Sequence, residues 1–323
     1  MSALFRRFGS LIGMAAIVIF FALALPDTFM TARNWLNISQ QISMLAVVAA
    51  VMTVVMVMGD FDLSVGSMAS LAGVVAAVLF VQGWSVPAAL AAAIGVGLIG
   101  GLFNGVLVSV IGILPFVATL ATLTVYSGAA FLVSDGKTIF GRDIPATFSD
   151  FARSGMALGD IDGRPAIFPA LSLVALAVTA IVWVVLEQTS YGRRLYAIGG
   201  NAEAARLAGV PVTVLRLSAF AFTGVGAAIA GLMYASRVAS ANPVQGDGLM
   251  LTAIAAVFLG MTLTENGQPR VLATLAGVVV LGVLDNGLTQ MSVDSYVREV
   301  LVGAIILIAV SASALGRRGL FGR

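Results

Sequence analysis

Long apolar stretches alternate with short polar segments along most of this chain. A helix needs about 17–25 apolar residues to cross a bilayer, and about ten stretches have a suitable length. The predicted spans are 10–26, 40–58, 63–82, 86–110, 114–134, 166–187, 214–235, 249–264, 270–289 and 297–316. The expected fold class is therefore an all-α polytopic membrane protein, with residues 1–323 forming a single transmembrane domain.

Two predicted spans are less regular than the others. The span 63–82 begins beside Asp60 and Asp62, and the span 249–264 is short. Short or interrupted spans are often broken helices that line a cavity. These two spans are therefore the candidates for a broken helix.

Basic residues predict the orientation of the helices. Arginines precede the first span, follow the last, and occur again in the loop 188–213, whereas aspartates balance the basic residues of the loop 135–165. Basic loops stay in the cytoplasm, and an even number of spans puts both termini there. The loop 135–165 then lies on the periplasmic side. The arginines are Arg6, Arg7, Arg193, Arg194, Arg206, Arg317, Arg318 and Arg323.

The N-terminal segment has a second interpretation. Arg6 and Arg7, the apolar run after them and the stretch Ala22-Leu23-Ala24 also resemble a cleavable signal peptide. Cleavage would leave nine spans and would put the two ends of the mature chain on opposite sides of the membrane.

A short motif occurs twice. Leu-Phe-Asn-Gly at 102–105 in the fourth span returns as Leu-Asp-Asn-Gly at 284–287 in the ninth. The copies lie five spans apart, so they would cross the membrane in opposite directions, which is typical of a five-plus-five inverted repeat. Chance matching between Gly- and Leu-rich segments would give the same similarity.

Composition agrees with a membrane protein and excludes several kinds of chemistry. Of the 323 residues, 60% are hydrophobic and 10% are charged, against about a quarter charged in a soluble domain. The chain has no cysteine and no histidine, so it lacks disulfides, a thiolate nucleophile and the commonest general base and metal ligand. We therefore expect no enzyme activity and no metal site. In a membrane protein the net charge of +2 reflects topology rather than nucleic-acid binding.

Two glycine motifs resemble nucleotide-binding loops but stand in the wrong context. The G-x-G-x-x-G match at 95–100 lies inside an apolar span, with no preceding strand. Gly97, Gly101 and Gly105 instead form a smooth stripe that predicts close helix packing. The Gly-Lys-Thr at 136–138 lacks the first glycine of a Walker A loop, where Phe131 stands. We therefore expect no ATP site on this chain.

The loop 188–213 contains signals for a short surface helix. Asn201 is suited to cap it, Glu203 favours its first turn, and Gly209 and Pro211 end it. Its small residues suit a partner's groove, although an interfacial helix without a partner would have the same spacing. The candidate docking residues are Asn201, Glu203, Ala204, Ala205, Arg206, Leu207 and Gly209.

This loop and a second motif resemble a known family. Residues 203–209, Glu-Ala-Ala-Arg-Leu-Ala-Gly, resemble the EAA-type coupling loop of ATP-binding-cassette (ABC) importer permeases. Residues 59–67 are similar to the GGIDLSVGS signature of the ribose/xylose/arabinose permease family, with Asp60 where many members have glycine. With residues 134–137 and 206–211, these motifs look most like those of L-arabinose permeases.

The resemblance covers about residues 40–315 and departs from the family in one turn. Glu265 and Pro269 stand within 260–271, where the family usually has a glycine-rich turn. This departure puts the geometry of that turn in doubt, but the other motifs still indicate the same family.

The resemblance implies a type II ABC importer-like permease domain for the translocation of a monosaccharide, a pentose such as L-arabinose. The implied partners are a second permease copy or a close paralogue, ABC ATPase subunits docked on 201–209, and a periplasmic sugar-binding protein. ATP and Mg would be bound by the ATPase, with no cofactor on this chain. The implied location is the bacterial cytoplasmic (inner) membrane.

Polar and aromatic residues in the spans are the candidates for the substrate pathway, because polar groups are costly in lipid. Asp62 and Ser64 fit equally well as a helix cap, and Asn104 and Asn286 as hydrogen bonds between helices. Aromatic residues such as Phe116 and Tyr126 would stack on a sugar or simply pack. The candidates are Asp60, Asp62, Ser64, Asn104, Phe116, Asp285 and Asn286.

Two other functions compete with an ATP-driven permease. An ion-driven secondary sugar transporter would need neither an ATPase nor the loop 188–213. A membrane-embedded enzyme would need catalytic groups, and the absence of histidine and cysteine argues against it.

Overall fold

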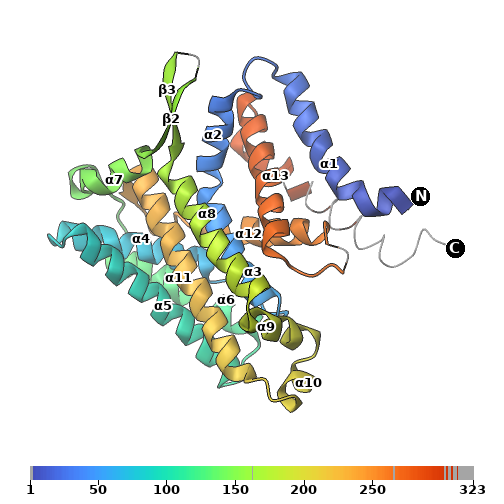
Figure 1. Ribbon diagram of the computed structural model, residues 1–323. Coiled ribbons are helices and arrows are strands. Elements are labelled where there is room, and N and C mark those ends of the chain that lie inside the picture. Colours follow the sequence, from blue (N-terminus) through green and yellow to red (C-terminus); the bar gives the residue numbers. More distant parts are fainter. Residues whose placement is uncertain are drawn as a thin grey trace.

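The computed structural model describes residues 3–161, 163–264, 266–301, 303, 304, 307 and 311. Most of this chain is helical, and the helices lie side by side in an elongated bundle (Figure 1). The tenth predicted span, 297–316, lies largely outside the described residues, and Glu265, Arg317, Arg318 and Arg323 lie wholly outside them.

The described residues contain enough long apolar helices for a polytopic membrane protein. Five helices are long and apolar enough to cross a membrane, and a bent pair makes a sixth candidate. The five are α5 (Val86–Ser109), α6 (Pro115–Ser134), α8 (Ala170–Trp183) with its π-helical end (Val184–Gln188), α11 (Val212–Val238) and α13 (Val271–Gln290). Shorter apolar helices are α4 (Val65–Val81), α12 (Asp247–Met261) and the Ile12–Ala24 part of α1 (Ala3–Ala24). The expected fold class is confirmed.

Neither of the two candidate spans is broken. The spans at 63–82 and 249–264 are the continuous helices α4 and α12. The second span is instead bent by 49° between α2 (Ala32–Gln41) and α3 (Ser43–Met56). The bend separates an amphipathic helix from an apolar one, and the apolar pattern alone did not reveal the polar half.

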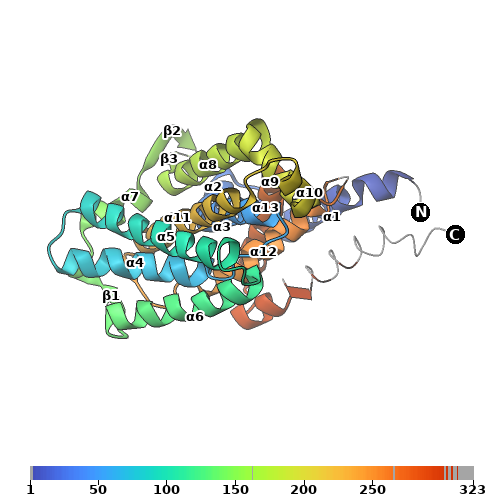
Figure 2. The ribbon, with the colours of Figure 1, turned by 90° about the horizontal axis from the view of Figure 1, so that it is seen from below.

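Polar side chains of α2 hold it against other elements. Gln40 Nε2 donates to the carbonyl of Ala152 at 2.7 Å, and the hydroxyls of Ser39 and Ser172 lie 3.0 Å apart. All residues of α3, in contrast, are buried, as in a central helix that is hydrophobic all round. Helices α8, α11, α12 and α13 pack around it. Figure 2 shows α5, α4 and α6 side by side next to this centre.

The glycine stripe of α5 makes the close packing that the sequence predicts. A Cβ added at Gly97 would lie 2.5 Å from the carbonyl oxygen of Gly224 in α11. One added at Gly101 would lie 2.3 Å from that of Phe220. Side chains at these positions would force the two helices apart. The stripe is therefore a helix-packing surface.

Small β elements lie in and beside the predicted outer loop. Strands β2 (Gly155–Ile161) and β3 (Arg164–Pro169) form an antiparallel hairpin, so the sixth span begins at Ala170 rather than at residue 166. The short strands β1 (Ile139–Phe140) and β4 (Ser240–Ala241) pair with each other, and a 3-10 turn (Gly141–Asp143) follows β1. Figure 1 shows the hairpin projecting from one end of the bundle.

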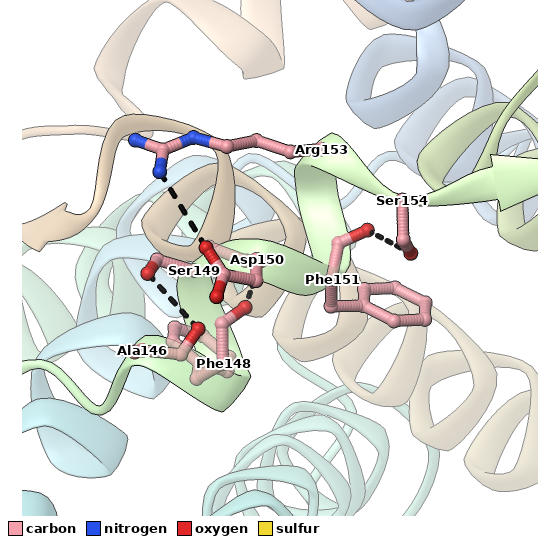
Figure 3. Close-up of polar contacts among 8 residues, drawn as sticks. Ala146, Phe148, Ser149, Asp150, Phe151, Arg153 and Ser154 are labelled. Atoms are coloured by element: carbon pink, nitrogen blue, oxygen red, sulfur yellow. Dashed lines mark hydrogen bonds and ion pairs between the residues drawn. The ribbon is translucent and has the colours of Figure 1, made fainter. Parts of the chain in front are cut away.

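A short amphipathic helix, α7 (Ala146–Arg153), covers the same end of the bundle. Its outer side carries local contacts, including an Arg153–Asp150 ion pair at 3.5 Å (Figure 3). Its inner side buries Phe148, whose ring centroid lies 5.1 Å from that of Phe80. The carbonyl of Phe148 also accepts a hydrogen bond from Ser236 at 2.6 Å. These contacts fix the predicted outer loop to α4 and α11.

Candidate functional site

The predicted surface helix is present as α10 (Ala202–Leu207), with the predicted start and stop. Asn201 Oδ1 accepts a hydrogen bond from the Ala204 backbone N–H at 2.9 Å, which caps the helix. Gly209 has a left-handed φ of 81°, and the Val210 N–H donates to the Ala205 carbonyl at 3.0 Å. Asn201 and Gly209 therefore have the local roles that their residue types indicate.

Helix α10 presents an exposed surface at the opposite end of the bundle from the β2–β3 hairpin (Figure 1). Only Ala205 of this helix is buried, whereas Leu207 is 77% exposed. Glu203 and Arg206 form an ion pair at 2.6 Å on the surface. The neighbouring guanidinium lowers the pKa of Glu203 below its ordinary value. The exposed face thus combines an apolar residue with a fixed pair of charges.

A second helix in the same loop was missed. Helix α9 (Ser190–Gly200) precedes α10 and buries Leu195 and Ile198. Thr189 accepts from the Gly192 N–H at its start, and the Tyr191 and Ser218 hydroxyls lie 2.9 Å apart. The capping threonine and the three-residue spacing of the buried side chains were signals for this helix.

Three of the predicted pathway residues meet in one buried network. Asp62 Oδ1 accepts from the Ser64 backbone N–H at 3.0 Å and from its hydroxyl at 2.6 Å. Asn104 Nδ2 donates to the Ser64 hydroxyl at 2.8 Å, and Thr223 Oγ1 donates to Asp62 Oδ2 at 2.6 Å. We call Asp62, Ser64, Asn104 and Thr223 the Asp62 cluster. Its side chains are no more than 2% exposed, so no open passage reaches them in this conformation.

The hydrogen bonds of Asp62 and Ser64 bear on the alternative that these two residues cap helix α4. Ser64 occupies the N-cap position of α4, but its side chain makes no capping hydrogen bond. Its hydroxyl donates to Asp62 instead. The expected interhelical hydrogen bond from Asn104 is present, since α5 carries Asn104 and joins it to Ser64.

Asp60 lies two residues before the cluster and has a different partner. Its carboxylate accepts from Arg216 Nη2 at 3.1 Å, and its other oxygen lies 2.9 Å from Arg216 Nε. The Asp60 side chain is 4% exposed and that of Arg216 is 26% exposed. Sequence reasoning missed Arg216 and Thr223, because each is separated from its partner by more than 150 residues of chain.

The remaining candidates lie elsewhere in the bundle. Asp285 on α13 accepts from Gln41 at 2.6 Å and from Arg298 at 2.8 Å. Asn286 is buried and accepts from Gln290 at 2.8 Å. Phe116 lies near the start of α6 and is 56% exposed. The seven pathway candidates therefore do not converge on one site within a single chain.

A polar cavity of about 290 Å³ adjoins α9. Glu187 at the end of α8 lies 3.8 Å from Arg270 and accepts from the Val271 N–H at 2.9 Å. Tyr196 donates to the carbonyl of Pro269 at 2.8 Å. The cavity lining is Leu186, Glu187, Gln188, Arg193, Tyr196, Gln268 and Arg270. These contacts attach residues 269–271 to the ends of α8 and α9, although the preceding turn departs from the family pattern.

The chain combines apolar spans, a buried polar cluster between them and the exposed helix α10 at one end of the bundle. These features define a polytopic membrane protein of the permease class. A family model described as "Branched-chain amino acid transport system / permease component" matches residues 34–310. The chain therefore belongs to this permease family. The resemblance found in its motifs is confirmed, and its relatives are transport permeases rather than enzymes.

Individual relatives match along nearly the whole chain. The ribose import permease protein RbsC of Bacillus subtilis is 36% identical over 94% of this chain and 92% of its own length. The L-arabinose transport system permease protein AraH of Escherichia coli is 34% identical over 94% of this chain and 89% of its own length. The D-allose transport system permease protein AlsC of E. coli is 31% identical over 96% and 92%, respectively. No solved structure gave a significant match.

Proposed function

We propose that this chain is the transmembrane permease subunit of an ATP-driven monosaccharide importer. In this function, sugar passes from a periplasmic binding protein through the permease to the cytoplasm. The support is its membership of the permease family together with relatives that are named for ribose, L-arabinose and D-allose transport. The motifs favour a pentose similar to L-arabinose as the substrate.

The observation that carries the ATP-driven reading is the exposed, capped helix α10. An ion-driven transporter does not require this helix. The seven candidate docking residues on and beside it are Asn201, Glu203, Ala204, Ala205, Arg206, Leu207 and Gly209. A short helix with one buried and several exposed residues suits insertion into a groove of another subunit. The ATPase would bind ATP and Mg, and this chain would bind no cofactor.

The pathway would form between this chain and a second copy or a close paralogue. Helix α6 supports this arrangement because Phe116, Leu120 and Val125 on it are about half exposed. An apolar face of this kind faces lipid or a partner helix. Phe116 is then available to a sugar at the interface. The other six candidates would influence the pathway from positions behind this interface. They are Asp60, Asp62, Ser64, Asn104, Asp285 and Asn286.

The orientation follows from the two ends of the bundle. Helix α10 would face the cytoplasm of the bacterial inner membrane, and the β2–β3 hairpin would face the periplasm. Both termini would be cytoplasmic, in agreement with the basic residues near them.

Uptake by reconstituted vesicles tests the proposal. Vesicles would contain the permease with its ATPase. The binding protein and labelled L-arabinose, D-ribose or D-allose would be added on the side that corresponds to the periplasm. We expect uptake that requires ATP and the binding protein and persists when proton and sodium gradients are collapsed. Uptake by the permease alone, driven by an ion gradient, would establish the secondary transporter instead.

A further inference from the structure

The loop between α3 and α4, residues 57–64, connects features that the proposed function leaves separate. Six of its eight residues are buried, including both aspartates, whereas Gly59, with a left-handed φ of 80°, is exposed. Buried irregular backbone in a membrane protein needs specific partners for its polar groups. Two of its contacts are with α6 and α12: Thr119 Oγ1 donates to the Phe61 carbonyl at 3.3 Å, and the Phe61 ring centroid lies 6.2 Å from that of Phe258. Three further contacts, with α9, α11 and α5, connect the loop to the docking segment and the bundle.

The first contact joins the loop to the end of α9. A Cβ added at Gly199 would lie 1.9 Å from the carbonyl oxygen of Val57. The two backbones therefore touch without an intervening side chain, so a displacement of α9 cannot be absorbed by a rotamer change. Gly199 lies two residues before Asn201, the cap of the docking helix α10.

The second contact joins the loop to the start of α11. Asp60 pairs with Arg216, five residues after Pro211, at which the docking segment ends. A charged pair with one member buried holds its geometry, because separating it would leave a charge unpaired. Both the entry to α10 and the exit from it are thus attached to this one loop.

The third contact carries the loop into the bundle. Asp62 accepts from Thr223, two helical turns after Arg216 on α11, and Asn104 on α5 bonds to Ser64. The loop therefore holds α11 at two heights and reaches α5, the helix that packs on α11 through its glycine stripe.

We propose that the 57–64 loop is the relay that transmits movement of the docked ATPase from α9 and α10 to α5 and α11. Gly199, Asp60 and Arg216 are its positioning residues. The inference rests on the proposed function, and it gives a specific route to the coupling that an ATP-driven importer requires. It also assigns Asp60 and Asp62, which were candidates for the substrate pathway, to this connection between helices.

The relay is tested by the amount of sugar transported per ATP hydrolysed in the reconstituted complex of permease, ATPase and binding protein. Gly199→Ala should lower this ratio by about tenfold while the ATPase still co-purifies. Gly200→Ala is the matched control, because its added methyl would meet no atom within 4 Å. It should keep the wild-type ratio.

The Asp60–Arg216 pair provides an independent arm that separates relay from stability. Asp60→Asn and Arg216→Gln should each lower both the ratio and the melting temperature. The double variant leaves no unpaired charge, so it should recover the melting temperature but not the ratio.

Either of two results would overturn the relay. One is a wild-type ratio for Gly199→Ala; the other is recovery of the ratio together with the melting temperature in the double variant. Absence of ATP-dependent uptake by the wild-type complex would instead overturn the proposed function itself.

Discussion

Two segments at the same end of the bundle differ in how they are held. Helix α10 is exposed and is stabilised by contacts within three residues, such as the Asn201 cap and the Glu203–Arg206 pair. The 57–64 loop is mostly buried and is held by contacts with α5, α6, α9, α11 and α12. The difference agrees with the proposal that α10 offers a surface to a partner, and it shows that the 57–64 loop connects several helices of the bundle.

Loss of the buried carboxylate should have the largest effect on stability. In Asp62→Ala, the donors of Ser64 and Thr223 lose their acceptor inside the bundle. We expect the free energy of unfolding to fall by about 2–4 kcal/mol. Thermal unfolding of the detergent-solubilised permease measures the change.

Asp150→Ala is the control for that experiment. Asp150 is also paired, but its side chain is 63% exposed, so its removal should leave the melting temperature unchanged. Equal effects of the two substitutions would show that the burial of Asp62 does not determine its contribution to stability.

Loss of the α10 cap should have a smaller and local effect. Asn201→Ala removes the acceptor of the Ala204 N–H, at a cost of about 1 kcal/mol in helix stability. We expect about fivefold weaker binding of the ATPase, with no change in the melting temperature of the permease.

Thr31→Ala provides a matched cap at another place. Thr31 caps α2 by accepting from the Asn34 N–H at 3.2 Å, away from α10. ATPase affinity should be unchanged in this variant. If the two caps affected affinity equally, binding would not depend on the local order of α10.

The surface ion pair should have the smallest effect on stability, and its pH dependence has a defined sign. Arg206 lowers the pKa of Glu203, so the pair is complete above the ordinary glutamate pKa of 4.5 and is lost as pH falls through the lowered value. Glu203→Gln should therefore leave the melting temperature unchanged at neutral pH, although it removes one charge from the docking surface.

Titration of ATPase binding checks this expectation. Affinity of the wild-type permease should be constant from neutral pH down to 4.5 as far as Glu203 is concerned. The assignment would be contradicted if the difference in ATPase affinity between wild type and Glu203→Gln changed with pH in the neutral range.

The same contrast explains what the sequence could predict. The start, the end and the exposure of α10 follow from Asn201, Gly209 and Pro211, which act on their immediate neighbours. The α5 glycine stripe was also predictable, because helical spacing places its members on one face. Both predictions are confirmed by the structure.

Long-range partners were beyond local reasoning. Asp60 and Arg216 are separated by 156 residues, and no local pattern joins them. The bend between α2 and α3 was missed for a related reason, since long-range polar contacts with Ala152 and Asp285 hold α2 in addition to its buried Ile38. The five-plus-five inverted repeat stays a prediction.

Site-specific crosslinking tests the central claim, that α10 is the surface driven by an ATPase. The chain has no cysteine, so Leu207→Cys and Leu158→Cys would each carry a single photoreactive maleimide on an exposed position. Leu207 lies on α10, and Leu158 lies on β2 at the other end of the bundle. We predict that the label at position 207 crosslinks to the ATPase in the transport-competent complex and that the label at position 158 does not. Crosslinking of the ATPase at position 158, or its absence at position 207, would contradict the account.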